Sequence, residues 1–321
     1  MSTFSKELKV AYKYNVRLEE IPESEKSDSI IIYGLTPLLP MHLGFDPIIA
    51  TLRYFKYKGF KIKIIFGDTY LRMEDKLKIG PKEYENVCNY YKYIFQKCGL
   101  ENAEFVLHSD ATANSTYWFQ LANIANDMSL RNVYQSIPGE YRNDSIPLAK
   151  SLHTLMQTND IEYFGATHVL GSLTQERIYY VSRDLLRKND FDIPGVILIS
   201  ETQDLFGQLL KFSSSKSRLS YHEDSGSLKN KLGQLNSSHS DVIRSLFINS
   251  VMPYEKSSVD GKPLTIEVLN DFLEDESEKT FAKVISLLYN GLITRLEKLN
   301  KDFKKTPELI SWIDLDRVRG Y

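Results

Sequence analysis

The sequence predicts an α/β protein with a Rossmann-like parallel sheet, helices on both faces of that sheet, and a smaller all-helical C-terminal domain. Short apolar stretches rich in β-branched residues alternate with longer stretches whose apolar residues recur at helical spacing, as in parallel sheets with crossover helices. From about Val242 only the helical pattern continues. We therefore expect two domains, residues 1–221 and residues 222–321, in a chain long enough to bury a sizeable core.

The first strand and the loop after it predict where a ligand would bind. Ile30–Ile32 is an apolar β-branched run of the kind that is buried on both faces of a sheet, and Gly34 ends it. Two prolines follow, and residues 42–45 lead into helical spacing. In a parallel sheet this junction lies at the carboxyl edge of the strands, where ligands usually bind. A helix amino terminus beside a glycine also suits a phosphate.

The same two patterns predict the other elements. Gly59 is a stop signal for the first helix, and Pro81 stands in the first turn of the next helix, where its missing N–H costs nothing. Further strands are expected at 60–66, 104–107, 168–170 and 196–200. Further helices are expected at 81–98, 115–128, 148–158, 174–186 and 276–299. The more polar segments are predicted as a helix and loop over 1–28, an exposed excursion over 134–148, and a mobile stretch over 222–240.

Composition excludes several classes of protein. The formal net charge of -2 gives no overall attraction to nucleic acid or to anionic membranes. The two cysteines, Cys88 and Cys98, exclude a disulfide framework and a cysteine-based zinc site, and no residue is assigned to a metal. No apolar run has the length of a signal peptide or a membrane span, so we expect a cytoplasmic protein without a membrane partner.

Five segments, in order, resemble the class I aminoacyl-tRNA synthetases, specifically the tyrosyl/tryptophanyl branch and its archaeal and eukaryotic tyrosyl members. H-L-G-F at 42–45 resembles the H-I-G-H signature, and K-F-S-S-S at 211–215 resembles K-M-S-S-S. G-D-T-Y at 67–70 is similar to the family's A-D-x-H, and G-S-L-T-Q-E-R-I at 171–178 is similar to G-G-x-x-Q-R-K-I. The fifth segment is M-Q-T-N-D-I-E-Y-F-G at 156–165. Any one of these segments alone would be a weak signal.

The resemblance implies ATP-dependent activation of an amino acid as its aminoacyl-adenylate. The amino-acid carboxylate attacks the α-phosphate of ATP, so the protein mainly positions groups and stabilises charge on phosphate oxygens. His42 and Lys211 are the implied catalytic residues, with Mg²⁺ on the pyrophosphate. The implied ATP-binding residues are Gly34, His42, Gly44, Phe45, Lys211, Ser213, Ser214 and Ser215. The alternatives are a helix cap at His42 and a flexible linker over 211–216.

The resemblance also implies an amino-acid site. In it, Gln157 and Gln175 hold the α-amino group, and Asp160 meets the phenol hydroxyl in tyrosyl enzymes. The complete implied set is Ile32, Asp68, Tyr70, His153, Gln157, Asp160 and Gln175. The alternative is a helix whose buried amides are satisfied by the backbone.

The chain departs from the family pattern at several of these positions. Ile32 stands where a tyrosine is expected, and Tyr33, one residue later, would face the other side of the strand. His153 stands where another tyrosine is expected, and Phe45 replaces the last histidine of the first signature. The amino acid is therefore left open, since a polar or cationic side chain suits Asp160 as well as a phenol does.

Three functions stay open for this chain: two enzymes that differ in the acceptor of the activated amino acid, and one inactive homologue. The resemblance implies transfer to tRNA by a homodimer. However, the archaeal anticodon-reading pattern H-P-x-D-L-K is absent, and E-S-E-K-T-F at 276–281 stands in its place. One alternative is a tRNA-independent paralogue that forms an amide or ester with a small molecule. The other is an inactive homologue that binds RNA or protein, although the retained signature residues argue against it.

Overall fold

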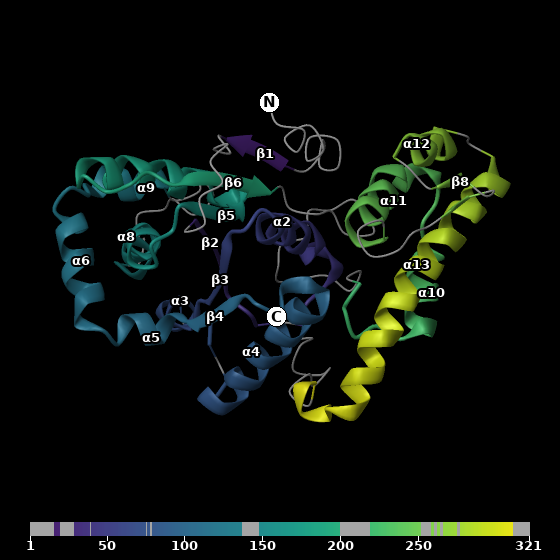
Figure 1. Ribbon diagram of the computed structural model, residues 1–321, viewed down its shortest axis with the longest axis horizontal. Coiled ribbons are helices and arrows are strands. Elements are labelled where there is room, and N and C mark those ends of the chain that lie inside the picture. Colours follow the sequence, from purple (N-terminus) through teal and green to yellow (C-terminus); the bar gives the residue numbers. More distant parts are fainter. Residues whose placement is uncertain are drawn as a thin grey trace.

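The computed structural model describes residues 16–19, 29–38, 40–74, 76–77, 79–136, 148–199, 219–251, 258–259, 262–263, 266–274 and 277–310. Within these ranges, a sheet with helices on both faces is followed by a group of C-terminal helices that lie to one side of it (Figure 1). The predicted fold class is confirmed. The domain boundary at 222 stays a prediction.

The sheet has six strands in the order β1-β6-β5-β2-β3-β4. All neighbouring pairs are parallel except β1 with β6. The strands are β1 (Val16–Glu19), β2 (Ile30–Leu35), β3 (Lys61–Phe66), β4 (Glu104–Leu107), β5 (His168–Ser172) and β6 (Gly195–Ile199). The five strands expected from the apolar runs are therefore present.

Strand β1 corrects the prediction of a helix and loop over 1–28. Its four residues alternate apolar and polar, V-R-L-E, and they pair antiparallel with β6 at the edge of the sheet. Four residues are too short a pattern to separate a strand from a helix. The pairing is decided by the open edge of β6, about 180 residues later in the chain.

The helical elements of the first part of the chain connect these strands. They are η1 (Leu43–Phe45), α2 (Asp46–Tyr57), α3 (Asp68–Met73), α4 (Pro81–Phe95), η2 (Gln96–Leu100), α5 (His108–Thr112), α6 (Ser115–Ala125), α7 (Leu130–Ser136), α8 (Leu148–Tyr163), η4 (Leu173–Gln175) and α9 (Glu176–Lys188). The stop after α2 is confirmed, because Gly59 has φ +90°, a conformation that side chains disfavour. The expected excursion over 134–148 begins inside α7, and residues 137–147 lie outside the described ranges.

Helices cover both faces of the sheet, and successive residues of β2 point to opposite faces. Ile31 and Tyr33 are buried in one apolar cluster with residues of α2 and α4. Ile32 is buried in a second cluster, with residues of α6, α8 and α9. The prediction that Tyr33 faces away from Ile32 is confirmed.

The C-terminal part is helical, with one exception. Its elements are α10 (Ser225–Leu232), η5 (Ser237–His239), α11 (Ser240–Leu246), η6 (Phe247–Val251), β7 (Ser258–Val259), β8 (Lys262–Pro263), α12 (Ile266–Glu274), α13 (Glu278–Lys305) and η7 (Pro307–Leu309). The two-residue strands β7 and β8 form a short hairpin that the helical pattern did not predict. None of the described helices combines the length and the apolar content that a bilayer crossing requires.

The segment predicted as mobile, 222–240, contains α10 and η5, so that prediction was wrong. Asp224 caps α10 by accepting a hydrogen bond from the backbone N–H of Ser227 at 2.9 Å. Leu228 and Leu232, four residues apart, are fully buried in the same apolar cluster as α13. Two leucines among polar residues are a weak pattern in the sequence, and packing against α13 is what stabilises the helix.

The strand order identifies the edge at which a ligand would bind. The chain runs from β2 to β3 and β4 on one side, whereas β5 and β6 lie on the other side. Parallel β2 and β5 are neighbours, with Ile32 beside Val169. Their carboxyl ends therefore form the topological switch point of the sheet. The chain leaves β2 towards the first signature and leaves β5 towards Gln175.

Candidate active site

The first signature forms a capped turn at the switch point. His42 has an extended backbone, and its Nδ1 accepts a hydrogen bond from the backbone N–H of Gly44 at 3.1 Å. The imidazole is buried, with its ring centroid 5.1 Å from that of Phe45. The cap that the sequence left as an alternative is therefore present. A role of His42 on phosphates stays a prediction.

The chain just after the second signature pairs with the first signature. The N–H of Leu43 donates to the carbonyl of Leu219 at 2.8 Å, and the N–H of Tyr221 donates to the carbonyl of Met41 at 3.0 Å. Lys211 and Ser213–Ser215 lie outside the described residues. Leu219, the first described residue after them, is hydrogen-bonded to the turn that carries His42.

Asp46, directly after this turn, lies in a buried ion pair. Its two carboxylate oxygens accept hydrogen bonds from the two terminal nitrogens of Arg295, at 2.8 and 2.6 Å. The hydroxyl of Tyr221 also donates to Asp46. The carboxylate is fully buried, and Arg295 is 8% exposed.

In the sequence, Asp46-Pro47 is typical of a helix cap followed by the first helical residue, but Asp46 does not cap α2. Phe45 is the N-cap of α2, and Asp46 is its first residue. The residues next to Asp46 in the sequence cannot reveal that its ion-pair partner is Arg295 on α13, 249 residues away. The cluster joins α2, the chain after the second signature, and the long C-terminal helix.

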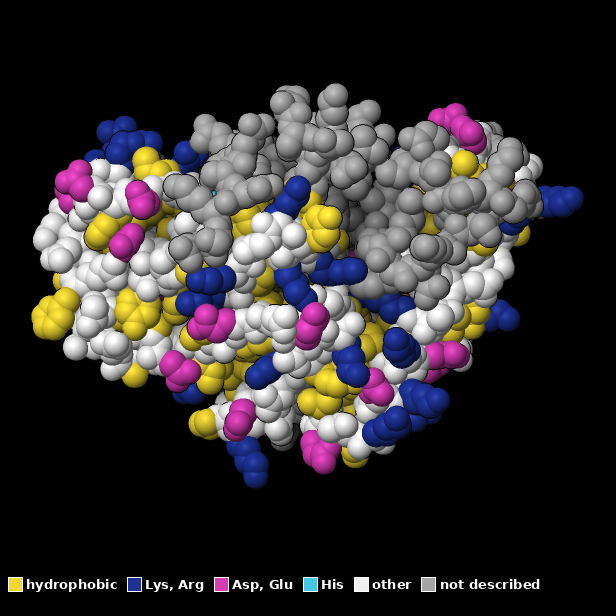
Figure 2. Space-filling view, in the orientation of Figure 1, with side chains coloured by type: hydrophobic (Ala, Val, Ile, Leu, Met, Phe, Trp, Pro, Cys, Tyr) yellow, Lys and Arg dark blue, Asp and Glu magenta, His cyan; other side chains and the backbone are white. Residues whose placement is uncertain are grey.

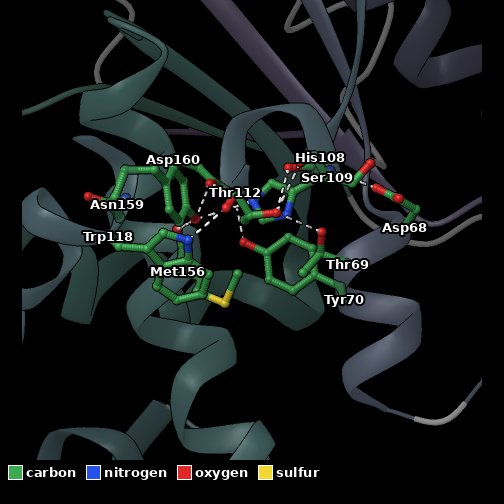
Figure 3. A network of polar contacts seen from close by, with 11 residues as sticks. Asp68, Thr69, Tyr70, His108, Ser109, Thr112, Trp118, Met156, Asn159 and Asp160 are labelled. Carbon is green, nitrogen blue, oxygen red and sulfur yellow. Dashed lines mark hydrogen bonds and ion pairs between the residues drawn. The ribbon is translucent and has the colours of Figure 1, made fainter. Parts of the chain in front are cut away.

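A second buried carboxylate, Asp160 on α8, accepts three hydrogen bonds from other side chains (Figure 3). The hydroxyl of Tyr70 donates to Oδ2 at 2.6 Å, and the hydroxyl of Tyr117 donates to Oδ1 at 2.7 Å. Nε2 of His108 lies 2.8 Å from Oδ1. Asp160 is 6% exposed, and the ring of His108 is fully buried.

Two imidazole rings lie against the ring of Tyr70. Its ring centroid is 4.5 Å from that of His108 and 4.5 Å from that of His153. Nδ1 of His153 lies 3.3 Å from a carboxylate oxygen of Glu74. The hydrogen bond with His153 is the main cause that lowers the pKa of Glu74 to about 2. Two ring contacts therefore hold the ring of Tyr70 in place.

The two glutamines behave differently. Oε1 of Gln175 accepts a hydrogen bond from the backbone N–H of Ser172 at 3.2 Å, as part of a capping box at the start of η4. Gln157 Oε1 is buried and has no hydrogen-bond partner within the described chain. An unpaired buried amide oxygen is costly, so Gln157 is the better acceptor for a ligand N–H group.

Asp68 and Ile32 complete the implied amino-acid site. Oδ1 of Asp68 accepts the backbone N–H of Ser109 at 2.9 Å, which orients the start of α5 (Figure 3). Ile32 is buried in the same apolar cluster as Tyr70. The residues of the predicted amino-acid set therefore lie within β2, after the carboxyl ends of β3 and β5, and on α8.

Sequence reasoning missed two residues of this network. His108 directly follows β4 at the carboxyl edge of the sheet, so strand position alone could have indicated it. Tyr117, on α6, carries no local signal. Its contact with Asp160 depends on the packing of α6 against α8.

Comparisons with known proteins identify the family and the fold. The model of the family described as tRNA synthetases class I (W and Y) matches residues 24–299. Tyrosine–tRNA ligase of Methanobrevibacter smithii is 30% identical over 210 residues, which are 64% of this chain and 65% of that protein. Tyrosine–tRNA ligase of Methanopyrus kandleri is 24% identical over 283 residues, 87% of this chain and 81% of that protein.

A solved structure shows the same fold. Tyrosyl-tRNA synthetase from Archaeoglobus fulgidus, complexed with L-tyrosine, has a TM-score of 0.75 at 20% identity and covers 96% of this chain and 100% of its own. At that identity the likeness concerns the fold. The family match, by contrast, extends over most of the chain and includes both signatures. The chain therefore belongs to the class I aminoacyl-tRNA synthetases of the tryptophan and tyrosine branch.

Proposed function

We propose that this chain activates an amino acid with ATP as the aminoacyl-adenylate and transfers the aminoacyl group to tRNA. The observation that carries the proposal is the convergence of residues at the switch point. His42 and Gly44 follow β2, Gln175 follows β5, and residues 219–221, which come shortly after the second signature in the sequence, are hydrogen-bonded to residues 41 and 43. A reaction between two bound substrates depends on such positioning.

The phosphates of ATP would lie along the first signature. Gly34 is exposed at the end of β2, and a Cβ added there would meet no atom within 4 Å, so the backbone is open to a ligand. Lys211 and Ser213–Ser215 would meet the pyrophosphate. Mg²⁺ usually keeps several waters and binds substrate phosphates, so we assign it to ATP rather than to a set of protein ligands.

The amino acid would lie on the other side of the same edge. Gln157 Oε1 accepts a hydrogen bond from the α-ammonium group, which supplies the partner that this buried oxygen lacks among the described residues. A carboxylate oxygen of the amino acid then bonds to the α-phosphorus, and the bond from that phosphorus to pyrophosphate breaks. In the second step an acceptor hydroxyl of tRNA attacks the carbonyl carbon, and AMP leaves.

The proposal includes a homodimer in the cytoplasm. Four large apolar side chains are exposed on α6 and α7: Trp118, Phe119, Leu130 and Tyr134. Phe119 and Leu130 are 72% and 81% exposed, and a second copy of the chain would cover them. Light scattering on the purified protein distinguishes a dimer from a monomer.

Amino-acid-dependent exchange between ATP and pyrophosphate tests the function. We expect exchange with at least one standard amino acid, and charging when total tRNA is added. Gln157→Met should raise the KM for the amino acid more than the KM for ATP, and Gln234→Met, at an exposed position, is the matched control. Exchange without charging would support the tRNA-independent paralogue. No exchange with any amino acid would overturn the proposal.

A further inference from the structure

The acceptor positions of Asp160 are nearly filled by the protein itself. A carboxylate offers about four lone-pair positions. Among the described residues, Tyr117 and His108 take both positions on Oδ1, and Tyr70 takes one on Oδ2. A ligand hydroxyl would be a fourth donor to a carboxylate that already has three.

These three donors are held in place by packing. Tyr117 and His108 are fully buried, and Tyr70 is 6% exposed and in contact with two imidazole rings. Burial raises the pKa of Tyr70 and of Tyr117 well above the ordinary value, and the Asp160 carboxylate adds to the effect, so both phenols stay protonated donors. Nδ1 of His108 is buried without a hydrogen-bond partner in the described chain, and Nε2, 2.8 Å from Oδ1, is the ring nitrogen that meets Asp160.

We propose that the amino-acid site does not read a side-chain hydroxyl, and that the substrate is an amino acid with an apolar side chain, chosen by shape against Ile32 and the ring of Tyr70. Asp160 is then a positioning residue, which fixes Tyr70 and Tyr117 as part of the wall. This inference rests on the proposed function and names its substrate class.

The physical reason lies in how sites reject analogues. A site built for a hydroxyl rejects the analogue without it by about 10⁴ to 10⁵, because a buried polar group of the site is left unpaired. Asp160 is not left unpaired when the ligand lacks a hydroxyl, since Tyr70, Tyr117 and His108 already donate to it. Phenylalanine, which is tyrosine without its hydroxyl, is therefore the informative comparison.

The experiment measures kcat/KM for ATP–pyrophosphate exchange with each standard amino acid. We expect an apolar amino acid to be the best substrate, and tyrosine to exceed phenylalanine by less than about tenfold. A larger preference for tyrosine, or a polar amino acid as the best substrate, would overturn the inference while leaving the proposed function intact. No exchange with any amino acid would overturn both.

One substitution tests the role of Tyr70 directly. Tyr70→Phe removes the donor to Oδ2 and keeps the ring, so the ratio of tyrosine to phenylalanine exchange should rise at least about tenfold. The matched control is Tyr93→Phe, because the hydroxyl of Tyr93 donates to Asp302 at 2.7 Å at a distant site, and its ratio should not change. An unchanged ratio in a folded Tyr70→Phe protein would contradict the inference. If that variant does not fold, the wild-type ratio alone decides.

Discussion

Two buried carboxylates lie on either side of the sheet and have different partners. Asp46 faces a cation, with the guanidinium of Arg295 on both of its oxygens. Asp160 faces two phenols and a histidine. Breaking a buried ion pair leaves a full charge without a partner, whereas a network of several donors loses one bond at a time. We therefore expect Asp46 to matter more for stability and Asp160 to matter more for substrate choice.

The surface near the C-terminal helices carries charges of both signs. Figure 2 shows Lys and Arg side chains over the lower part of the molecule near α13, with Asp and Glu between them. Lys301, Lys304 and Lys305 lie in this region, and Arg317 and Arg319 lie outside the described residues. A face of mixed charge gives no separate argument for tRNA binding.

The largest expected effect is the loss of Arg295. Arg295→Met should lower the free energy of unfolding by about 3–5 kcal/mol, because the Asp46 carboxylate stays buried without its cation. Chemical denaturation measures the loss. The double variant Asp46→Asn with Arg295→Met removes both charges and should recover most of it. A single-variant loss below about 1 kcal/mol would show that the pair is not the main partner of Asp46.

The second largest effect on the free energy of unfolding is expected at the other carboxylate, Asp160. Asp160→Asn replaces one acceptor oxygen by an NH₂ group, so one of the surrounding donors loses its partner at a cost of about 1–3 kcal/mol. The same denaturation series should rank it below Arg295→Met. The reverse order would break the comparison between the two carboxylates.

A third buried group, His168, sharpens the comparison, because burial favours its neutral form over its charged form. Burial lowers the pKa of His168 to about 4, from an ordinary value of 6.5. The contribution of the neutral, buried His168 to the free energy of unfolding is fully present above pH 6.5. It is lost as the pH falls towards 4, because the imidazole of the unfolded chain binds a proton at a higher pH than that of the folded chain. The loss should be at most about 3 kcal/mol, since each pKa unit between 6.5 and 4 corresponds to about 1.4 kcal/mol. Unfolding of His168→Leu should show a smaller pH dependence in this window, and an unchanged slope would contradict the prediction.

The smallest effect concerns the half-buried pair beside Tyr70. Glu74, with its pKa lowered to about 2 mainly by the hydrogen bond with His153, contributes stability above pH 4.5 that is lost as the pH falls through 2. His153→Gln should cost less than about 1 kcal/mol at neutral pH, because both side chains are partly exposed. A larger cost would mean that His153 acts mainly through its contact with the Tyr70 ring, and His153→Phe would then restore stability.

Local patterns in the sequence were enough to predict the five parallel strands, the helix stops, the family, and the opposite orientations of Ile32 and Tyr33. Each of these depends on neighbours within a few residues, or on short motifs that recur in order. The hypothesis that Asp160 meets a substrate hydroxyl also came from such a motif. The motif names the residue, but it does not say which groups already donate to it.

Only the tertiary structure decided the partners of the buried polar groups. Asp160 meets Tyr70, His108 and Tyr117 across 90, 52 and 43 residues of sequence. Asp46 meets Arg295 across 249 residues, and the edge of β6 accepts β1 from the start of the chain. A buried polar group must find a hydrogen-bond partner, but any donor that packing brings near can serve. Periodicity along the chain therefore predicts which residues are buried, and the three-dimensional packing of distant segments determines what they contact.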